Sequence, residues 1–144
     1  MKRLAAAMLS LALLGGAAAT AYAVDVDAQR ETIMKEMGKT MKGLAAIAKG
    51  QAPFDANSVK AGGELIAKDL ETFGTLFDPG TETNASEGPA PEIWTDRAGF
   101  DAARNNAITA AQKLAMADEA GFGDALKELG GTCAACHKKY RLSN

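Results

Sequence analysis

The feature that most constrains this chain is the pentapeptide Cys133-Ala134-Ala135-Cys136-His137 near its C-terminus. Residues three and four apart share one face of a helix, so both sulfurs and the imidazole can lie on the same side. Two thiols at this spacing, with a histidine directly after the second, are the attachment signature of c-type haem. Cys133 and Cys136 would then form thioethers to the porphyrin, and His137 would be the proximal ligand of the iron.

Other uses of a Cys-x-x-Cys pair suit this chain less well. A zinc site needs about four ligands, whereas the chain contains two cysteines and one histidine. A thioredoxin-like dithiol is expected near the start of a helix in a strand–helix–strand unit, and no segment here has the alternating pattern of a strand. We therefore expect one covalently attached haem c with its iron.

The first 23 residues have the pattern of a secretory signal peptide. Lys2 and Arg3 precede an apolar run over residues 4–19, and the small-x-small sequence of residues 21–23 provides a cleavage site. We expect a cleaved signal peptide over residues 1–23 and a mature haem domain over residues 24–144, exported to the periplasm. There the cysteines would serve as thioether donors rather than as a disulfide. No later segment approaches the ~20 apolar residues of a membrane span.

The charge of the mature chain bears on its partners. Removal of Lys2 and Arg3 leaves 14 basic residues against 18 acidic ones, a formal charge of −4. A mildly acidic surface without a basic cluster argues against nucleic acid as a partner. It is compatible with brief electrostatic docking to periplasmic redox partner proteins.

Apolar residues recur at helical spacing in four stretches. Asp55 suits the N-cap of the second, and Pro91 suits the first position of the third. The haem motif lies on the apolar stripe of the fourth. Short connections, with one long loop over residues 78–91, predict an all-α antiparallel up-down-up-down four-helix bundle with covalently bound haem near the C-terminal helix. The stretches cover about residues 27–49, 55–77, 91–119 and 124–140.

The second axial position of the iron decides what such a haem does. A second histidine is excluded, because the chain has only one. In the predicted bundle the end of the fourth helix packs beside the start of the first, which brings Met34 to the level of His137. Met37 faces nearly the same way and remains a competitor. Met41 lies ~10 Å further along the axis, and Met116 belongs to the opposite end of the bundle.

The motif near the C-terminus, followed by Tyr140 and Arg141, resembles the class II cytochromes c, which include cytochrome c′. Residues 33–38, 44–50 and 91–94 are similar to the low-spin cytochrome c-556 branch of that family. The resemblance covers almost the whole mature chain and implies that Met34 is the sixth ligand of the iron. In cytochrome c′ the corresponding residue usually does not ligate, and the five-coordinate iron binds small gases such as NO and CO.

Two functions follow from this comparison. We favour electron transfer through a six-coordinate low-spin haem ligated by His137 and Met34; the alternative is a gas-binding haem protein of the cytochrome c′ type. Neither is an enzyme, because the one histidine is committed to the iron and leaves no imidazole for acid–base chemistry.

Four further residues are candidates for the haem pocket. The resemblance suggests that Trp94 and Phe100 form part of its wall, although a plain core role suits both at least as well, and Tyr140 is a third aromatic candidate. Arg30, one helical turn before Met34, is either a partner of a haem propionate or a solvated residue. The resemblance also raises the possibility of a homodimer, and the sequence leaves monomer and dimer open.

Overall fold

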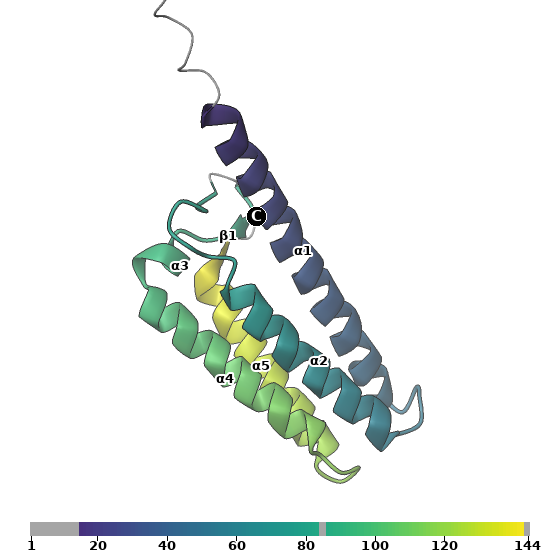
Figure 1. Cartoon of the computed structure of the whole chain (residues 1–144). Helices are drawn as coiled ribbons and strands as arrows, with labels where there is room; N and C mark the ends of the chain where they lie inside the picture. The colour runs from purple at the N-terminus through teal and green to yellow at the C-terminus, as the bar shows by residue number, and fades with distance from the viewer. Residues whose placement is uncertain (1–14, 84–85, 143–144) are drawn as a thin grey trace, which may run out of the picture.

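The computed structural model describes residues 15–83 and 86–142. Four long helices of this part of the chain form the predicted antiparallel bundle, in which α1 packs on α2, α2 on α4 and α4 on α5 (Figure 1). A short helix and a two-residue antiparallel strand pair lie at one end of it. The elements are α1 (Gly15–Ala48), α2 (Ala56–Gly74), β1 (Gly88–Pro89), α3 (Glu92–Thr95), α4 (Arg97–Ala115), α5 (Phe122–Tyr140) and β2 (Arg141–Leu142).

The first helix is longer than the sequence pattern predicts. It begins at Gly15 rather than near Asp27, and its first turns project beyond the rest of the bundle (Figure 1). Residues 1–14 of the predicted signal peptide lie outside the described residues, so the boundary at residue 23 stays a prediction. Within residues 15–83 and 86–142, no helix is both long enough and apolar enough to cross a membrane.

The connection between α1 and α2 follows standard capping chemistry. Gly50 has a φ of 69°, a left-handed conformation that glycine adopts without steric cost and that commonly ends a helix. Asp55 caps α2, because its carboxylate accepts a 2.8 Å hydrogen bond from the Ser58 amide. The predicted N-cap is thus confirmed.

The prediction of one continuous third helix is wrong. It is split at Asp96, whose φ of −128° and ψ of 56° leave the helical region, so that α3 ends at Thr95 and α4 begins at Arg97. The Asp96 carboxylate accepts a hydrogen bond from the Gly99 amide and caps α4. Pro91 is the residue before α3 rather than its first residue.

The end of the chain also departs from the expectation that the fold lacks strands. After α5 the backbone becomes extended, and Arg141 and Leu142 pair with Pro89 and Gly88. The Ala90 amide donates to the Tyr140 carbonyl beside this pair. The loop before α3 is therefore hydrogen-bonded to the C-terminal end of α5.

The core has two parts. One runs through the middle of the bundle and is mostly aliphatic. The other, at the end where α3 lies, consists of Phe73, Phe77, Ile93, Phe100 and Tyr140. Four of these five side chains are aromatic, and their rings meet mainly edge to face, the favourable arrangement for aromatic pairs. We call this second cluster the aromatic layer.

Candidate haem site

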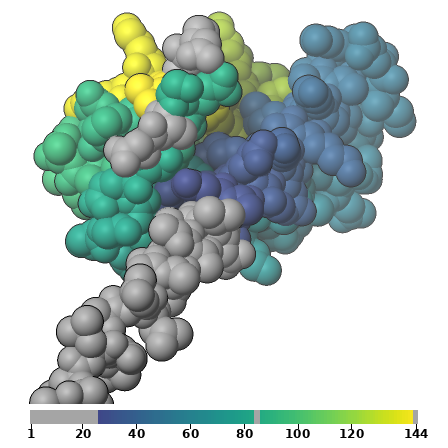
Figure 2. Space-filling model, turned by 90° about the horizontal axis from the view of Figure 1, so that it is seen from above, coloured from purple at the N-terminus to yellow at the C-terminus, as the bar shows by residue number. Residues whose placement is uncertain are grey.

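A cavity of about 860 Å³ lies at the end of the bundle between α1 and α5. This volume is within the usual range for ligand and cofactor sites. In Figure 2, which looks down on this end, atoms of the loop before α3 (teal and green) lie beside both the purple part of α1 and the end of α5 (yellow). The cavity is lined by Asp27, Arg30, Glu31, Met34, Lys35, Gly38, Phe73, Thr83, Glu87, Gly88, Pro89, Ile93, Phe100, Cys136, His137, Tyr140, Arg141 and Leu142.

The haem-attachment motif lies in the second half of α5, as predicted. Cys136 lines the cavity, whereas Cys133, one turn earlier, packs against the aliphatic core. The two sulfurs do not form a disulfide. Burial raises the pKa of both thiols, so both are protonated at neutral pH in the polypeptide. One free thiol lines the cavity and the other lies one helical turn before it, and both are available for thioether formation.

His137 is next to Cys136 and lines the same cavity. Burial lowers the pKa of its imidazole, and the positive charge of Arg141 lowers it further. Both effects favour the neutral ring, which is the form that binds a metal ion.

The structure separates the candidate methionines. Met34 is partly buried and lines the cavity from α1, opposite the wall formed by α5. Met37 is 8% exposed and belongs to the aliphatic core, which Met41 also contacts. Met116 lies just after α4, at the other end of the bundle, and is 81% exposed. Of the four methionines of the predicted mature chain, only Met34 lines the cavity with His137.

The aromatic candidates differ in whether they line the cavity. Tyr140 is 5% exposed and lines the cavity at the end of α5. Trp94 is not among the lining residues; its ring packs edge-on against Phe77 at a centroid distance of 5.6 Å, and its Nε1 donates to the Asp78 carbonyl. Phe100, the other aromatic candidate, does line the cavity, and Phe73 and Ile93 extend the apolar wall beside Tyr140.

Arg30 lines the cavity and is 3% exposed, so it is a buried residue rather than a solvated one. Its guanidinium forms an ion pair with Asp27 and donates to the backbone carbonyls of Leu76 and Thr81. Contact with a propionate stays a prediction.

The donors around the cavity fit a covalently attached haem. Cys136 and His137 line it and Cys133 is adjacent, while Met34 supplies a thioether sulfur from the other wall. Among the described residues, no group of three His, Cys, Asp or Glu side chains is arranged to hold a bare metal ion. The set therefore suits an iron that arrives within a porphyrin.

Sequence reasoning did not find the residues that close the cavity from the side. Thr83, Glu87, Gly88 and Pro89 belong to the long loop, and no periodic pattern places a loop in space. The one local signal is Gly88, whose φ of 97° is a conformation reserved largely for glycine.

A second hollow, of about 620 Å³, lies at the opposite end of the bundle between the α1–α2 and α4–α5 connections. Its lining includes Phe54, Phe122 and Glu119 but no cysteine, histidine or methionine. It offers no ligand set for haem.

Comparison with known proteins agrees with this geometry. Residues 25–141 match the model of the family described as Cytochrome C'. The chain is 39% identical to cytochrome c-556 of Agrobacterium fabrum over 145 residues, which cover 99% of this chain and 96% of the relative. Among solved structures it is similar to cytochrome c′ from Rhodopseudomonas palustris, with a TM-score of 0.76, 34% identity, and coverage of 83% of this chain and 98% of that one.

A further similar structure is the nitric oxide complex of a mutant of cytochrome c prime from Alcaligenes xylosoxidans. It has a TM-score of 0.75 and 29% identity, and the match covers 84% of this chain and 97% of that one. The cytochrome c-556 and cytochrome c′ relatives thus share one fold with this chain.

Proposed function

Because the chain belongs to the cytochrome c′ family, we propose that it is an electron-transfer protein in which His137 and Met34 are the two axial ligands of its haem iron. The cofactor of a c-type cytochrome is covalently bound haem c. We infer one haem per chain, because the sequence contains two cysteines and a single Cys-x-x-Cys-His motif.

The observation that carries the proposal is that Met34 and His137 line the same cavity from two different helices, α1 and α5. Met37, which the sequence analysis kept as an alternative to Met34 for the second axial position, is buried in the aliphatic core. The similarity to cytochrome c-556 over nearly the whole chain supports the same assignment.

The bound haem would supply one-electron chemistry at its iron. Cys133 and Cys136 would hold it covalently, and His137 and Met34 would fill both axial positions, so that no substrate binds. A thioether ligand opposite a histidine raises the reduction potential. The buried side chains of Phe73, Ile93 and Phe100 would exclude water from one side of the cavity and lower the local polarity.

The test is an absorption spectrum of the exported holoprotein in both redox states, with and without carbon monoxide. We expect low-spin spectra and little carbon monoxide binding by the ferrous protein. Met34→Leu conserves volume while it removes the sulfur, and it should give a high-spin ferrous spectrum with ready carbon monoxide uptake. Met37→Leu is the matched control and should leave the spectrum low-spin. A high-spin wild-type protein would refute the proposal.

A second candidate function is favoured by the structural neighbours. One of them is a nitric oxide complex of cytochrome c prime. In that case Met34 would only line the distal side of the cavity, and this protein would bind small gases. The spectrum of the wild-type protein with carbon monoxide separates the two functions, because only the second leaves an axial position open.

We further propose that the protein acts in the periplasm, after cleavage of residues 1–23, and exchanges electrons with periplasmic redox partner proteins. The formal charge of −4 of residues 24–144 suits transient partners of opposite charge. Sedimentation of the holoprotein would distinguish a monomer from a homodimer. No residue of the chain is assigned to catalysis.

A further inference from the structure

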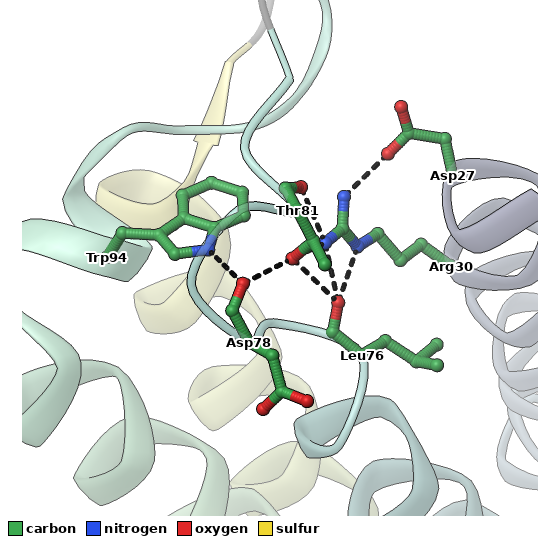
Figure 3. A network of polar contacts seen from close by, with 6 residues as sticks. All are labelled: Asp27, Arg30, Leu76, Asp78, Thr81 and Trp94. Carbon is green, nitrogen blue, oxygen red and sulfur yellow. Dashed lines mark hydrogen bonds and ion pairs between the residues drawn. The ribbon is translucent and has the colours of Figure 1, made fainter. Parts of the chain in front are cut away.

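The buried Arg30 side chain connects α1 to the turn that follows α2 (Figure 3). Its Nη2 donates to the Leu76 carbonyl at 2.5 Å, to the Thr81 carbonyl at 2.9 Å and to Thr81 Oγ1 at 2.8 Å, while Nε donates to the Leu76 carbonyl at 3.2 Å. Nη1 forms a 2.6 Å ion pair with Asp27 on the preceding turn of α1. We call residues 76–81 the anchoring turn.

The anchoring turn is itself ordered by hydrogen bonds. Thr81 Oγ1 donates to the Asp78 carbonyl at 2.7 Å, and the Thr81 amide donates to the same carbonyl at 3.1 Å. Trp94 Nε1 of α3 donates there as well, at 3.3 Å. Arg30 therefore contacts a turn that is also hydrogen-bonded to α3.

Arg30 also stacks on the aromatic layer. Its Cζ lies 4.3 Å from the ring centroid of Phe77 and 5.4 Å from that of Trp94, distances at which a guanidinium is attracted to the face of a ring. Lysine could not replace these contacts, because one ammonium cannot stack as a plane while it donates to two carbonyls and a carboxylate.

The stack continues to α5. Phe77 contacts Phe100 at a centroid distance of 5.1 Å, and Phe100 contacts Tyr140 at 5.5 Å. Tyr140 is the last residue of α5, three positions after His137. A series of packed side chains thus runs from Arg30, one turn before Met34, to the helix that carries His137.

The contacts from Arg30 to Tyr140 are important because the cavity separates α1 from α5 near Met34 and His137. The two helices share few direct contacts, and α1 packs mainly on α2. Their relative position at the cavity therefore depends on what holds α1 to the rest of this end of the molecule. Arg30 is the buried charged side chain that does so.

We propose that Arg30 is a positioning residue, which holds the wall that carries Met34 in register with the wall that carries His137 by binding the anchoring turn and stacking on Phe77. This inference rests on the proposed function, since it concerns the ligation of iron by Met34. It assigns to Arg30 a role that does not require contact with the haem.

The test compares exported holoprotein variants by spectrum and carbon monoxide affinity. Arg30→Gln loses the ion pair, the stacked plane and part of the donor set. If α1 then moves, the fraction of molecules with an open iron position rises, and the apparent affinity for carbon monoxide rises in proportion to it. We expect an increase of about tenfold or more, together with a partly high-spin ferrous spectrum.

Three further variants sharpen the comparison. Arg30→Lys keeps the charge and should not restore the low-spin spectrum fully. Thr81→Val keeps the branched shape of the side chain and removes the Oγ1 hydrogen bonds, so it should act in the same direction with a smaller effect. Lys39→Gln makes the same change of charge at an exposed position of α1 and should match wild type.

Amide hydrogen exchange of the anchoring turn gives a readout that does not depend on the iron. In Arg30→Gln and Thr81→Val the Thr81 amide should exchange faster than in Lys39→Gln. If exchange rises while the spectrum and carbon monoxide affinity stay at wild-type values, Arg30 only stabilises the fold and the inference is overturned.

The remaining outcomes are also decisive. A wild-type protein that is already high-spin refutes the proposed function, and this inference with it. A low-spin wild type with unchanged Arg30→Gln and Thr81→Val variants refutes the inference alone. If Arg30→Gln fails to assemble, Thr81→Val decides: a wild-type affinity for carbon monoxide in that variant overturns the inference.

Discussion

Tyr140 Oη donates a 3.0 Å hydrogen bond to Oδ2 of Asp96, the residue whose carboxylate also caps α4 through the Gly99 amide. Lys139 Nζ forms an ion pair with the same oxygen. One carboxylate therefore joins the start of α4 to the last turn of α5, within three residues of His137. The break between α3 and α4 serves this junction, because it frees Asp96 to bind all three groups.

Asp96 should make the stability of the protein depend on acid pH. Hydrogen bonds from Lys139, Tyr140 and the Gly99 amide lower the pKa of its carboxyl group. The contribution to stability is then complete above the pKa of the unfolded chain and is lost as the pH falls through the lower pKa of the folded one. The difference in thermal midpoint between wild type and Asp96→Asn should therefore be largest at neutral pH and shrink as the pH falls below the ordinary aspartate pKa of about 4.

Glu64→Gln provides the control for this titration. Glu64 pairs with Lys60 on the exposed face of α2, and such surface pairs contribute little. The thermal midpoint of the Glu64→Gln variant should equal that of wild type at every pH. A constant difference between wild type and Asp96→Asn across the pH range would contradict the expectation, since it would mean that the ionised carboxylate is not what stabilises the junction.

Gly63 should resist substitution because α2 and α4 approach each other closely there. A Cβ at Gly63 would lie 2.6 Å from the Ala111 carbonyl oxygen and 2.7 Å from the Ala115 amide nitrogen. Both are backbone atoms of α4, so the helices would have to separate. Overpacking of this kind typically costs about 1–3 kcal/mol, which denaturant unfolding of Gly63→Ala would measure.

Gly43→Ala is the matched control for Gly63→Ala. Gly43 is an exposed helical glycine of α1, and a Cβ there meets no atom within 4 Å. The substitution should raise stability by up to about 1 kcal/mol, because alanine is the better helix former. Similar effects of the two substitutions would show that close packing of α2 on α4 is not the reason for Gly63.

The exported protein should carry one haem per chain and no free thiol. If Cys133 and Cys136 form thioethers, an alkylating reagent will leave the unfolded holoprotein unmodified, and its mass will exceed that of the polypeptide by one haem. The same chain produced in the cytoplasm without residues 1–23 should retain two thiols. These should react slowly while the chain is folded, because burial raises the pKa of both. A disulfide in the exported protein would contradict the haem assignment.

Much of the fold could be predicted because its signals are local. The apolar spacing indicated the bundle, and Asp55 and Gly50 are capping residues whose role depends only on neighbours in the chain. The level of Met34 relative to His137 followed from helix geometry, and Met34 rather than Met37 lines the cavity with His137. Ligation itself stays a prediction.

The rest could not be predicted because it depends on partners distant in the sequence. Apolar spacing continues through Ile93, Trp94 and Phe100 and hides the break at Asp96. Asp96 is a residue type that caps helices, but its partners Lys139 and Tyr140 lie more than 40 residues away. Arg30 has the pattern of a solvated residue, and its burial depends on the carbonyls of Leu76 and Thr81, 46 and 51 residues on, and on the ring of Phe77.

The last prediction concerns where the mature chain begins. Cleavage after Ala23 would remove the projecting first turns of α1 and retain Val26, which is 3% exposed, and Asp27, which pairs with Arg30. Burial of a valine contributes about 1.5–3 kcal/mol. Holoprotein that starts at Val24 should therefore match the exported product in mass and thermal midpoint, whereas holoprotein that starts at Ala28 should unfold at a lower temperature. Equal thermal midpoints for the two chains would show that neither buried Val26 nor the Asp27–Arg30 ion pair stabilises the protein. An exported product with another N-terminus would show that the predicted cleavage site is wrong.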